Sequence, residues 1–124
     1  MFQFLAIAAG GAIGAILRFL ASAGVYQLAG RGFPWGTLFV NVLGSLTMGF
    51  LSILMVERLN LSPEWRAAVL TGGLGAFTTF STFSLETMAL FEQGEIIKAG
   101  TNMLVSVVIC VIACWVGLLL GRQV

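Results

Sequence analysis

A cluster of hydroxyl and phenyl side chains lies between Thr78 and Ser84 of this 124-residue sequence. Five of these seven residues carry a hydroxyl, and the other two, Phe80 and Phe83, are three positions apart. An aromatic ring is positive at its edge, so two rings presented edge-on attract an anion without a full positive charge. A weak site of this kind suits a pore, because the bound ion must be able to leave. Simple packing is the commoner role of phenylalanine in a membrane helix.

A run of glycines ending at Gly75 precedes this cluster and weakens the helix that the hydrophobic sequence predicts. Thr78 and Thr79 then offer competing side-chain hydrogen bonds, so we expect a break in the helix at about 75–79. Carbonyl groups exposed in the middle of a membrane must be satisfied by protein, water or an ion. Carbonyls from two antiparallel copies would suit a small hard cation such as sodium. The alternative is a continuous helix whose hydroxyls bond to the preceding turn.

A polar stripe runs along the hydrophobic segment that follows Pro34. Its members recur at helical spacing and are Thr37, Asn41, Ser45, Met48 and Ser52. Asn41 is the strongest hydrogen-bonding group among them, because its amide offers two donor hydrogens and an acceptor. Its functional role would be to donate to a dehydrating ion, whereas its common role in membranes is to hold helices together. The stripe alone favours the second interpretation.

Two charged residues fall within or near predicted membrane segments. Arg18 continues the helix face of Gly10 and Gly14, whose small size allows a close helix approach. It should face protein or water rather than lipid, unless its long side chain reaches the membrane boundary. Glu86 is a functional candidate because a buried carboxylate is costly, although it could simply pair with a basic group such as Arg18.

The last hydrophobic segment carries a weaker polar strip at four-residue spacing. Its members are Asn102, Ser106, Cys110 and Cys114. The two cysteines share one helix face but lack the further ligands of a metal site, so the sequence favours small buried thiols.

Composition identifies the elements that must position these residues. The chain is 59% hydrophobic and 9% charged, whereas soluble domains carry about 25% charged residues. We therefore predict an all-α membrane protein of one domain, residues 1–124. The expected membrane helices are roughly 3–28, 35–56, 65–91 and 97–121. The absence of histidine excludes His-dependent nucleophilic catalysis and His-ligated metals. No phosphate loop or nucleic-acid surface is evident either. We therefore expect neither an enzyme nor a nucleic-acid partner.

Loop charges hardly specify an orientation. Four helices place Arg58, Arg66 and Arg122 on one side of the membrane and Arg31 and Lys98 on the other. The chain could therefore insert both ways round, with oppositely oriented copies pairing about a two-fold axis in the membrane plane as an antiparallel homodimer. A single orientation, set by the free amine and the arginines, stays open as the alternative.

The chain resembles the Fluc/CrcB family of fluoride channels over nearly its whole length. The resemblance rests on three motifs: Gly10-x-x-x-Gly14-x-x-x-Arg18, Gly36-Thr37-Leu-x-Val40-Asn41-x-x-Gly44, and Gly75-x-x-Thr78-Thr79-Phe80-Ser81-Thr82-Phe83-Ser84-x-Glu86. The third motif is highly specific to that family. The span lengths and the weak charge bias fit it as well.

The resemblance implies a passive, fluoride-selective channel that exports cytoplasmic fluoride, built as a dual-topology dimer with two pores. It implies that Phe80 and Phe83 line the path and that Asn41 donates to fluoride, and we place Thr37, Thr82 and Ser106 on the same path. It also implies a structural sodium, not transported, bound by the backbone carbonyls of Gly75 and Thr78 from both subunits. Arg18 and Glu86 are left as structural or vestibule residues.

Where family members often carry hydroxyls on the last helix, this chain has Cys110 and Cys114, so the resemblance does not decide whether these thiols line the pore. The expected location is the bacterial plasma (inner) membrane, as a multi-pass protein surrounded by lipid. The alternative function is a small proton-coupled multidrug exporter. Such exporters usually need a carboxylate in the first helix, and this chain has no acid before Glu57.

Overall fold

The computed structural model describes all 124 residues and consists of helices without strands. The first span is α1, Phe2–Ala29, and the second is α2, Trp35–Ile53, continued by the π-helical segment η1, Leu54–Arg58. The third contains α3, Pro63–Arg66, the π-helical segment η2, Ala67–Leu74, then α4, Gly75–Phe77, and α5, Phe80–Glu92. The fourth is α6, Ile96–Gln123. All four spans are long and apolar enough to cross a membrane, which confirms the prediction of an all-helical chain with four membrane-spanning helices.

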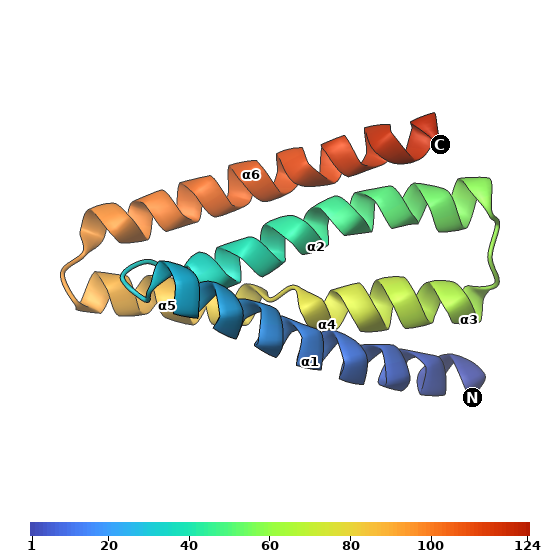
Figure 1. Cartoon of the computed structure of the whole chain (residues 1–124), viewed down its shortest axis with the longest axis horizontal. Helices are drawn as coiled ribbons and strands as arrows, with labels where there is room; N and C mark the ends of the chain where they lie inside the picture. The colour runs from blue at the N-terminus through green and yellow to red at the C-terminus, as the bar shows by residue number, and fades with distance from the viewer.

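The four spans run back and forth beside one another, so that both termini lie at the same end of the bundle (Figure 1). The connection between η1 and α3 lies at that end too, and the connections before α2 and before α6 lie at the opposite end. At the first end, the Arg58 guanidinium donates to the carbonyl of Arg122. At the other, Lys98 Nζ donates to the carbonyl of Gly32 at 3.2 Å. Basic side chains therefore sit at both ends of the bundle.

Glycines end two of the spans at the same side of the bundle. Gly30 follows α1 with φ 81°, and Gly94 follows α5 with φ 83°. These are left-handed backbone conformations, which glycine adopts without the steric penalty of a Cβ. The third span begins with Ser62 in the N-cap position and Pro63 in the first turn, although the Ser62 side chain makes no capping hydrogen bond.

Glycines also set the distances between the spans. A Cβ on Gly10 or Gly14 of α1 would collide with the carbonyl oxygens of Ala68 and Gly73 in η2. The backbones of α1 and η2 are therefore in direct contact, as the spacing of Gly10 and Gly14 predicts. Between lipid-exposed helices such contact supplies van der Waals attraction in place of a hydrophobic driving force.

Glycines also bring α2 and α6 together, and here each helix contributes a glycine that contacts the backbone of the other. A Cβ on Gly49 of α2 would collide with the carbonyl oxygen of Cys114, and one on Gly117 of α6 would collide with that of Leu46. The rest of the molecule is open: only 19 of the 124 residues are buried, and many large apolar side chains face outward. An outer surface of this kind needs lipid or another protein against it.

We expect Gly14→Ala to destabilise the folded protein, because the added methyl must displace the η2 backbone. Overpacking of this type costs about 1–3 kcal/mol. Gly24→Ala in the same helix is the matched control, since nothing lies within 4 Å of a Cβ placed there. The measurement is the thermal unfolding midpoint of each purified protein in detergent. Equal midpoints for the two variants would contradict the close contact of α1 with η2.

Candidate functional site

Two residues of the third span have extended backbone. Thr78 has φ −86° and ψ 159°, and Thr79 has φ −152° and ψ 121°. They lie between α4 and α5, where the ribbon of Figure 1 narrows to a loop. Backbone groups that leave a helix inside a membrane need new partners, so the hydrogen bonds of this segment define the site.

Asn41 of α2 supplies partners to both backbone groups of Thr79. Its amide nitrogen donates to the Thr79 carbonyl at 3.0 Å, and its amide oxygen accepts from the Thr79 N–H at 2.8 Å. The side chain thus mimics a neighbouring backbone and fixes α2 to the extended segment. An asparagine amide has two donor hydrogens, and this arrangement uses one of them. The other stays available to a ligand.

Two backbone N–H groups turn away from the carbonyls that they would contact in a continuous helix. The N–H of Thr79, which would reach Gly75, donates to Asn41, and the N–H of Thr82, which would reach Thr78, donates to Thr79 Oγ1 at 3.2 Å. The carbonyls of Gly75 and Thr78 therefore lose their usual helical donors. These are the two carbonyl groups to which the sequence resemblance assigns sodium.

Arg18 contacts the same interruption from α1. Its Nε donates to the carbonyl of Ala76 at 3.0 Å and so satisfies one of the carbonyls at the end of α4. A guanidinium at this place also places positive charge at a helix C-terminus, where it is favourable. Arg18 thus faces protein rather than lipid.

A groove of about 380 Å³ lies against the extended segment, between α2 and α6. Its lining residues are Asn41, Gly44, Ser45, Met48, Thr78, Thr79, Phe80, Phe83, Ser106, Val107, Cys110, Val111 and Cys114. None of them is charged. The Phe80 and Phe83 rings lie 5.4 Å apart between centroids at an interplanar angle of 47°. Phe83 is 8% exposed, whereas Phe80 is 75% exposed. Phe80 therefore has room for a partner beside it.

The groove gathers some of the residues singled out in the sequence and not others. Asn41, Phe80, Phe83 and Ser106 line it, and so do both cysteines. Thr37 and Thr82 do not line it.

The side chain of Thr37 is buried elsewhere, with its hydroxyl 3.4 Å from that of Tyr26. The backbone N–H of Thr82 bonds to the preceding threonine, Thr79, at the start of α5.

Glu86 lies in a second, more polar cavity of about 350 Å³, which Tyr26, Arg31 and Lys98 also line. Its Oε2 accepts a 2.9 Å hydrogen bond from the Tyr26 hydroxyl, while its Oε1 is buried without a partner. The Arg31 guanidinium stacks 4.5 Å from the centroid of the Tyr26 ring. Glu86 and Arg18 therefore have different partners and do not pair with each other.

Sequence reasoning missed a buried chain of hydrogen bonds behind the groove. Ser106 Oγ donates to Asn102 Oδ1 at 3.1 Å, and Asn102 Nδ2 donates to Thr87 Oγ1 at 2.9 Å. The Thr87 hydroxyl donates in turn to the carbonyl of Phe83 at 2.7 Å. The four-residue spacing of Thr87 from Phe83 was the available signal, because both then share a face of α5.

This chain has a chemical consequence for Ser106. Its single hydroxyl hydrogen is committed to Asn102, which is 1% exposed, so the oxygen meets the groove as an acceptor. Ser106 becomes a donor to an anion only by rotating its hydroxyl away from Asn102. Asn102 therefore controls what Ser106 offers to the groove.

This chain matches one protein family and relatives that share one name. Residues 5–118 match the family described as "CrcB-like protein, Camphor Resistance (CrcB)". A protein of Methylococcus capsulatus named "Fluoride-specific ion channel FluC" is 60% identical over 98% of this chain and 53% of its own length. Relatives with the same name in Magnetococcus marinus and Geobacter sulfurreducens are 52% and 47% identical, covering 98% and 99% of this chain and 99% of each relative. The chain thus spans about half the length of the first relative and nearly all of the other two.

We expect Asn41→Leu to release the extended segment, because it removes a donor and an acceptor from Thr79. Each unpaired, partly buried backbone group costs about 1–3 kcal/mol. The measurement is amide hydrogen exchange over residues 75–84 by mass spectrometry, in which we expect faster exchange. Thr47→Ala is the matched control on α2, since the Thr47 hydroxyl bonds only to the Leu43 carbonyl of its own helix. Unchanged exchange in Asn41→Leu would show that the amide does not hold the segment.

Proposed function

This chain belongs to the CrcB family, and we propose that it forms a fluoride-selective channel through which fluoride leaves the cytoplasm passively. Its four membrane-spanning helices and bacterial relatives make it a multi-pass bacterial membrane protein, and those relatives are named as ion channels, not enzymes. One structural observation carries the proposal: the amide of Asn41 and the rings of Phe80 and Phe83 line one groove that contains no charged side chain.

The groove suits a small anion for electrostatic reasons. Phenyl edges carry partial positive charge, and the spare N–H of Asn41 is a hydrogen-bond donor for an ion that sheds water. A lysine or arginine in the same place would bind the anion more tightly and slow its release. Conduction requires binding that is strong enough to admit the ion and weak enough to free it. We assign Asn41, Phe80 and Phe83 to the ion path on this basis.

The direction of transport follows from the chemistry of the ion. Hydrogen fluoride is a weak acid that crosses bilayers uncharged and ionises at neutral pH, which traps fluoride inside the cell. A negative interior potential drives the anion outward by about 2.3 kcal/mol per charge for each 100 mV. A passive pore is therefore sufficient, with no coupled ion or nucleotide.

We further propose that two copies assemble antiparallel, with a two-fold axis in the membrane plane. An apolar groove of about 610 Å³ supports this, formed by α1, α2 and the third span and lined by residues such as Gly10, Gly14 and Phe77. Phe80 is also largely exposed, beside the other groove, which we call the ion groove and which contains Asn41, Phe80 and Phe83. A second copy would cover Phe80 there. In an isologous pair each protomer contributes one groove that contains Asn41, Phe80 and Phe83, which gives two pores per dimer.

A structural sodium ion would sit on the same axis. Hard cations prefer oxygen ligands, and the carbonyls of Gly75 and Thr78 lose their helical donors to Asn41 and Thr79. Gly75 is also exposed at the surface of the protomer, so carbonyls from two copies have room to converge. The residues thus fit such an ion, which would take the place of the helical donors that these carbonyls lack.

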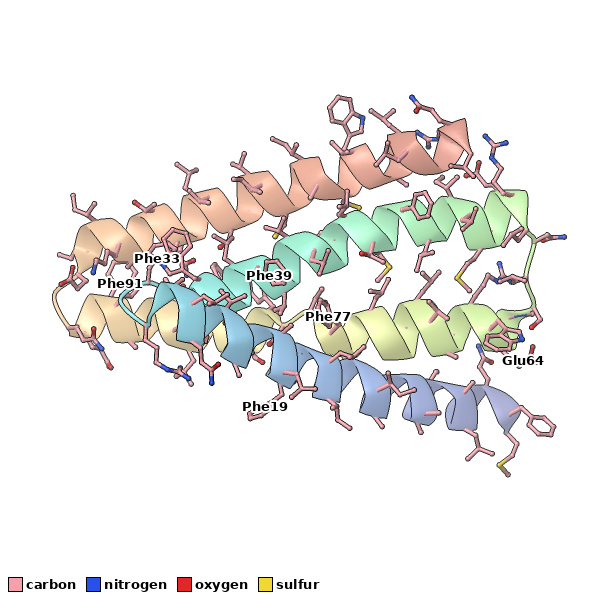
Figure 2. The ribbon with its side chains drawn as sticks, in the orientation of Figure 1. Phe19, Phe33, Phe39, Glu64, Phe77 and Phe91 are labelled. Atoms are coloured by element: carbon pink, nitrogen blue, oxygen red, sulfur yellow. The ribbon has the colours of Figure 1, made fainter.

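We expect Phe83→Ile and Phe80→Ile each to cut fluoride efflux while leaving the protein folded, because isoleucine keeps apolar bulk but has no positive ring edge. The measurement is fluoride release from chloride-free liposomes that contain the purified protein, read with a fluoride electrode. Phe19→Ile is the control, since Phe19 is 70% exposed and points away from the other helices in Figure 2. Wild-type rates in both ring variants would remove the rings from the path. If liposomes with the wild-type protein release no fluoride but show proton-dependent uptake of organic cations, the protein is instead an exporter.

The antiparallel assembly predicts that each loop is found on both sides of the membrane. We expect an impermeant maleimide to label about half of Gln93→Cys from outside intact cells, and the remainder after permeabilisation. Asn60→Cys, in the loop at the other end of the bundle, should behave in the same way. The unsubstituted protein measures background labelling of Cys110 and Cys114. Complete labelling of one loop and none of the other would establish a single orientation.

A further inference from the structure

The ion groove contains three sulfur side chains for which the proposed ion path has no use. Cys110 and Cys114 are both free thiols of intermediate exposure, and both line the groove. Met48 lines it from α2. A hydroxyl would serve an anion better than any of these groups, because thiols are weak donors and a thioether donates nothing. Their shared position in one cavity therefore calls for a chemical explanation.

The helix geometry places the two cysteines on one face of α6 and Met48 on the other wall of the same groove, in α2. Cys110 and Cys114 are one turn apart on α6, so their Cβ atoms lie about 5–6 Å from each other on the same face. Met48 precedes Gly49, the α2 residue whose missing side chain lets the Cys114 backbone make direct contact. Two helices held at this short distance bring a thioether to the wall opposite a pair of thiols.

We propose that Cys110 and Cys114, with Met48 as a third donor, form a binding site for a soft metal cation such as Cu(I) or Hg(II). Thiolate and thioether ligands select soft cations. The groove has no carboxylate, and the chain has no histidine, so harder metals find no suitable side-chain ligands there. Two thiols from one helix turn suit a cation that accepts two-coordinate binding.

The binding step balances without any redox change. Each S–H bond breaks, a sulfur–metal bond forms, and the proton passes to water. Hg(II) with two thiolates is electrically neutral, so the complex places no net charge in a groove that is largely apolar. Binding at this place would fill the groove next to Phe83 and close the ion path, a consequence that rests on the proposed channel function. The metal site itself does not depend on that function.

The binding test is a titration of the purified protein with mercuric nitrate in chloride-free buffer, followed by near-ultraviolet sulfur-to-mercury absorbance and by proton release. We expect one Hg(II) and two protons per chain. Cys110→Ser and Cys114→Ser should each release a single proton, and the double variant should lose the absorbance band. Met48→Leu, which keeps the volume of the side chain, should lose the metal to a competing thiol at lower competitor concentration than wild type. Two Hg(II) per chain, or no binding, would overturn the shared site.

The second measurement is fluoride efflux with and without one equivalent of Hg(II), expressed as a ratio to the untreated rate of the same variant. Wild-type efflux should fall to that of protein-free liposomes and recover when excess dithiol removes the metal, while the double variant should keep its own untreated rate. Stoichiometric binding with undiminished efflux would refute closure of the path by the metal. If the untreated wild type releases no fluoride, the channel proposal fails while the titration still decides the metal site.

Discussion

Inside a membrane every backbone N–H and carbonyl must find a partner in protein, water or an ion, and the rest of this structure depends on how that constraint is met at Thr78 and Thr79. The two residues are extended, so several backbone groups leave the helical pattern at once. Asn41 takes both groups of Thr79, and Arg18 takes the carbonyl of Ala76. A polar side chain from each of the first two spans therefore fixes the third.

The same hydrogen bonds create the groove. Asn41 holds the extended segment against α2, and Phe80 and Phe83 of α5 line the groove together with residues of α6. The wall that α6 contributes is kept in place by the buried chain from Ser106 through Asn102 to Thr87. The groove is largely apolar, with the Asn41 amide as a donor and no fixed charge. An uncharged wall of this kind can also carry thiols, whose preference is for soft cations.

The protomer by itself is an incomplete structure. Few residues are buried, Phe80 is mostly exposed, and an apolar groove remains open along α1 and the third span. Lipid can cover apolar side chains, but it offers nothing to carbonyl groups that have lost their helical donors. The proposed antiparallel partner would cover the apolar surface, and the proposed shared sodium ion would bind the carbonyl groups. Pore, dimer and cation site therefore depend on the same few residues.

Sequence alone determined the four spans, because twenty-residue apolar runs and the residues that interrupt them are written along the chain. It also indicated which side chains could do chemistry: Asn41 on a polar stripe, and Phe80 and Phe83 among hydroxyls. Only the tertiary structure decided their partners. It joined Asn41 to the Thr79 backbone, turned Thr37 toward Tyr26 and away from the groove, and linked Asn102 to Thr87. Helical spacing shows which residues share a face of one helix, but the partner of that face depends on how helices meet. Here that is fixed by backbone contacts at glycines: the spacing of Gly10 and Gly14 indicates a close approach, but it does not identify η2 as the partner.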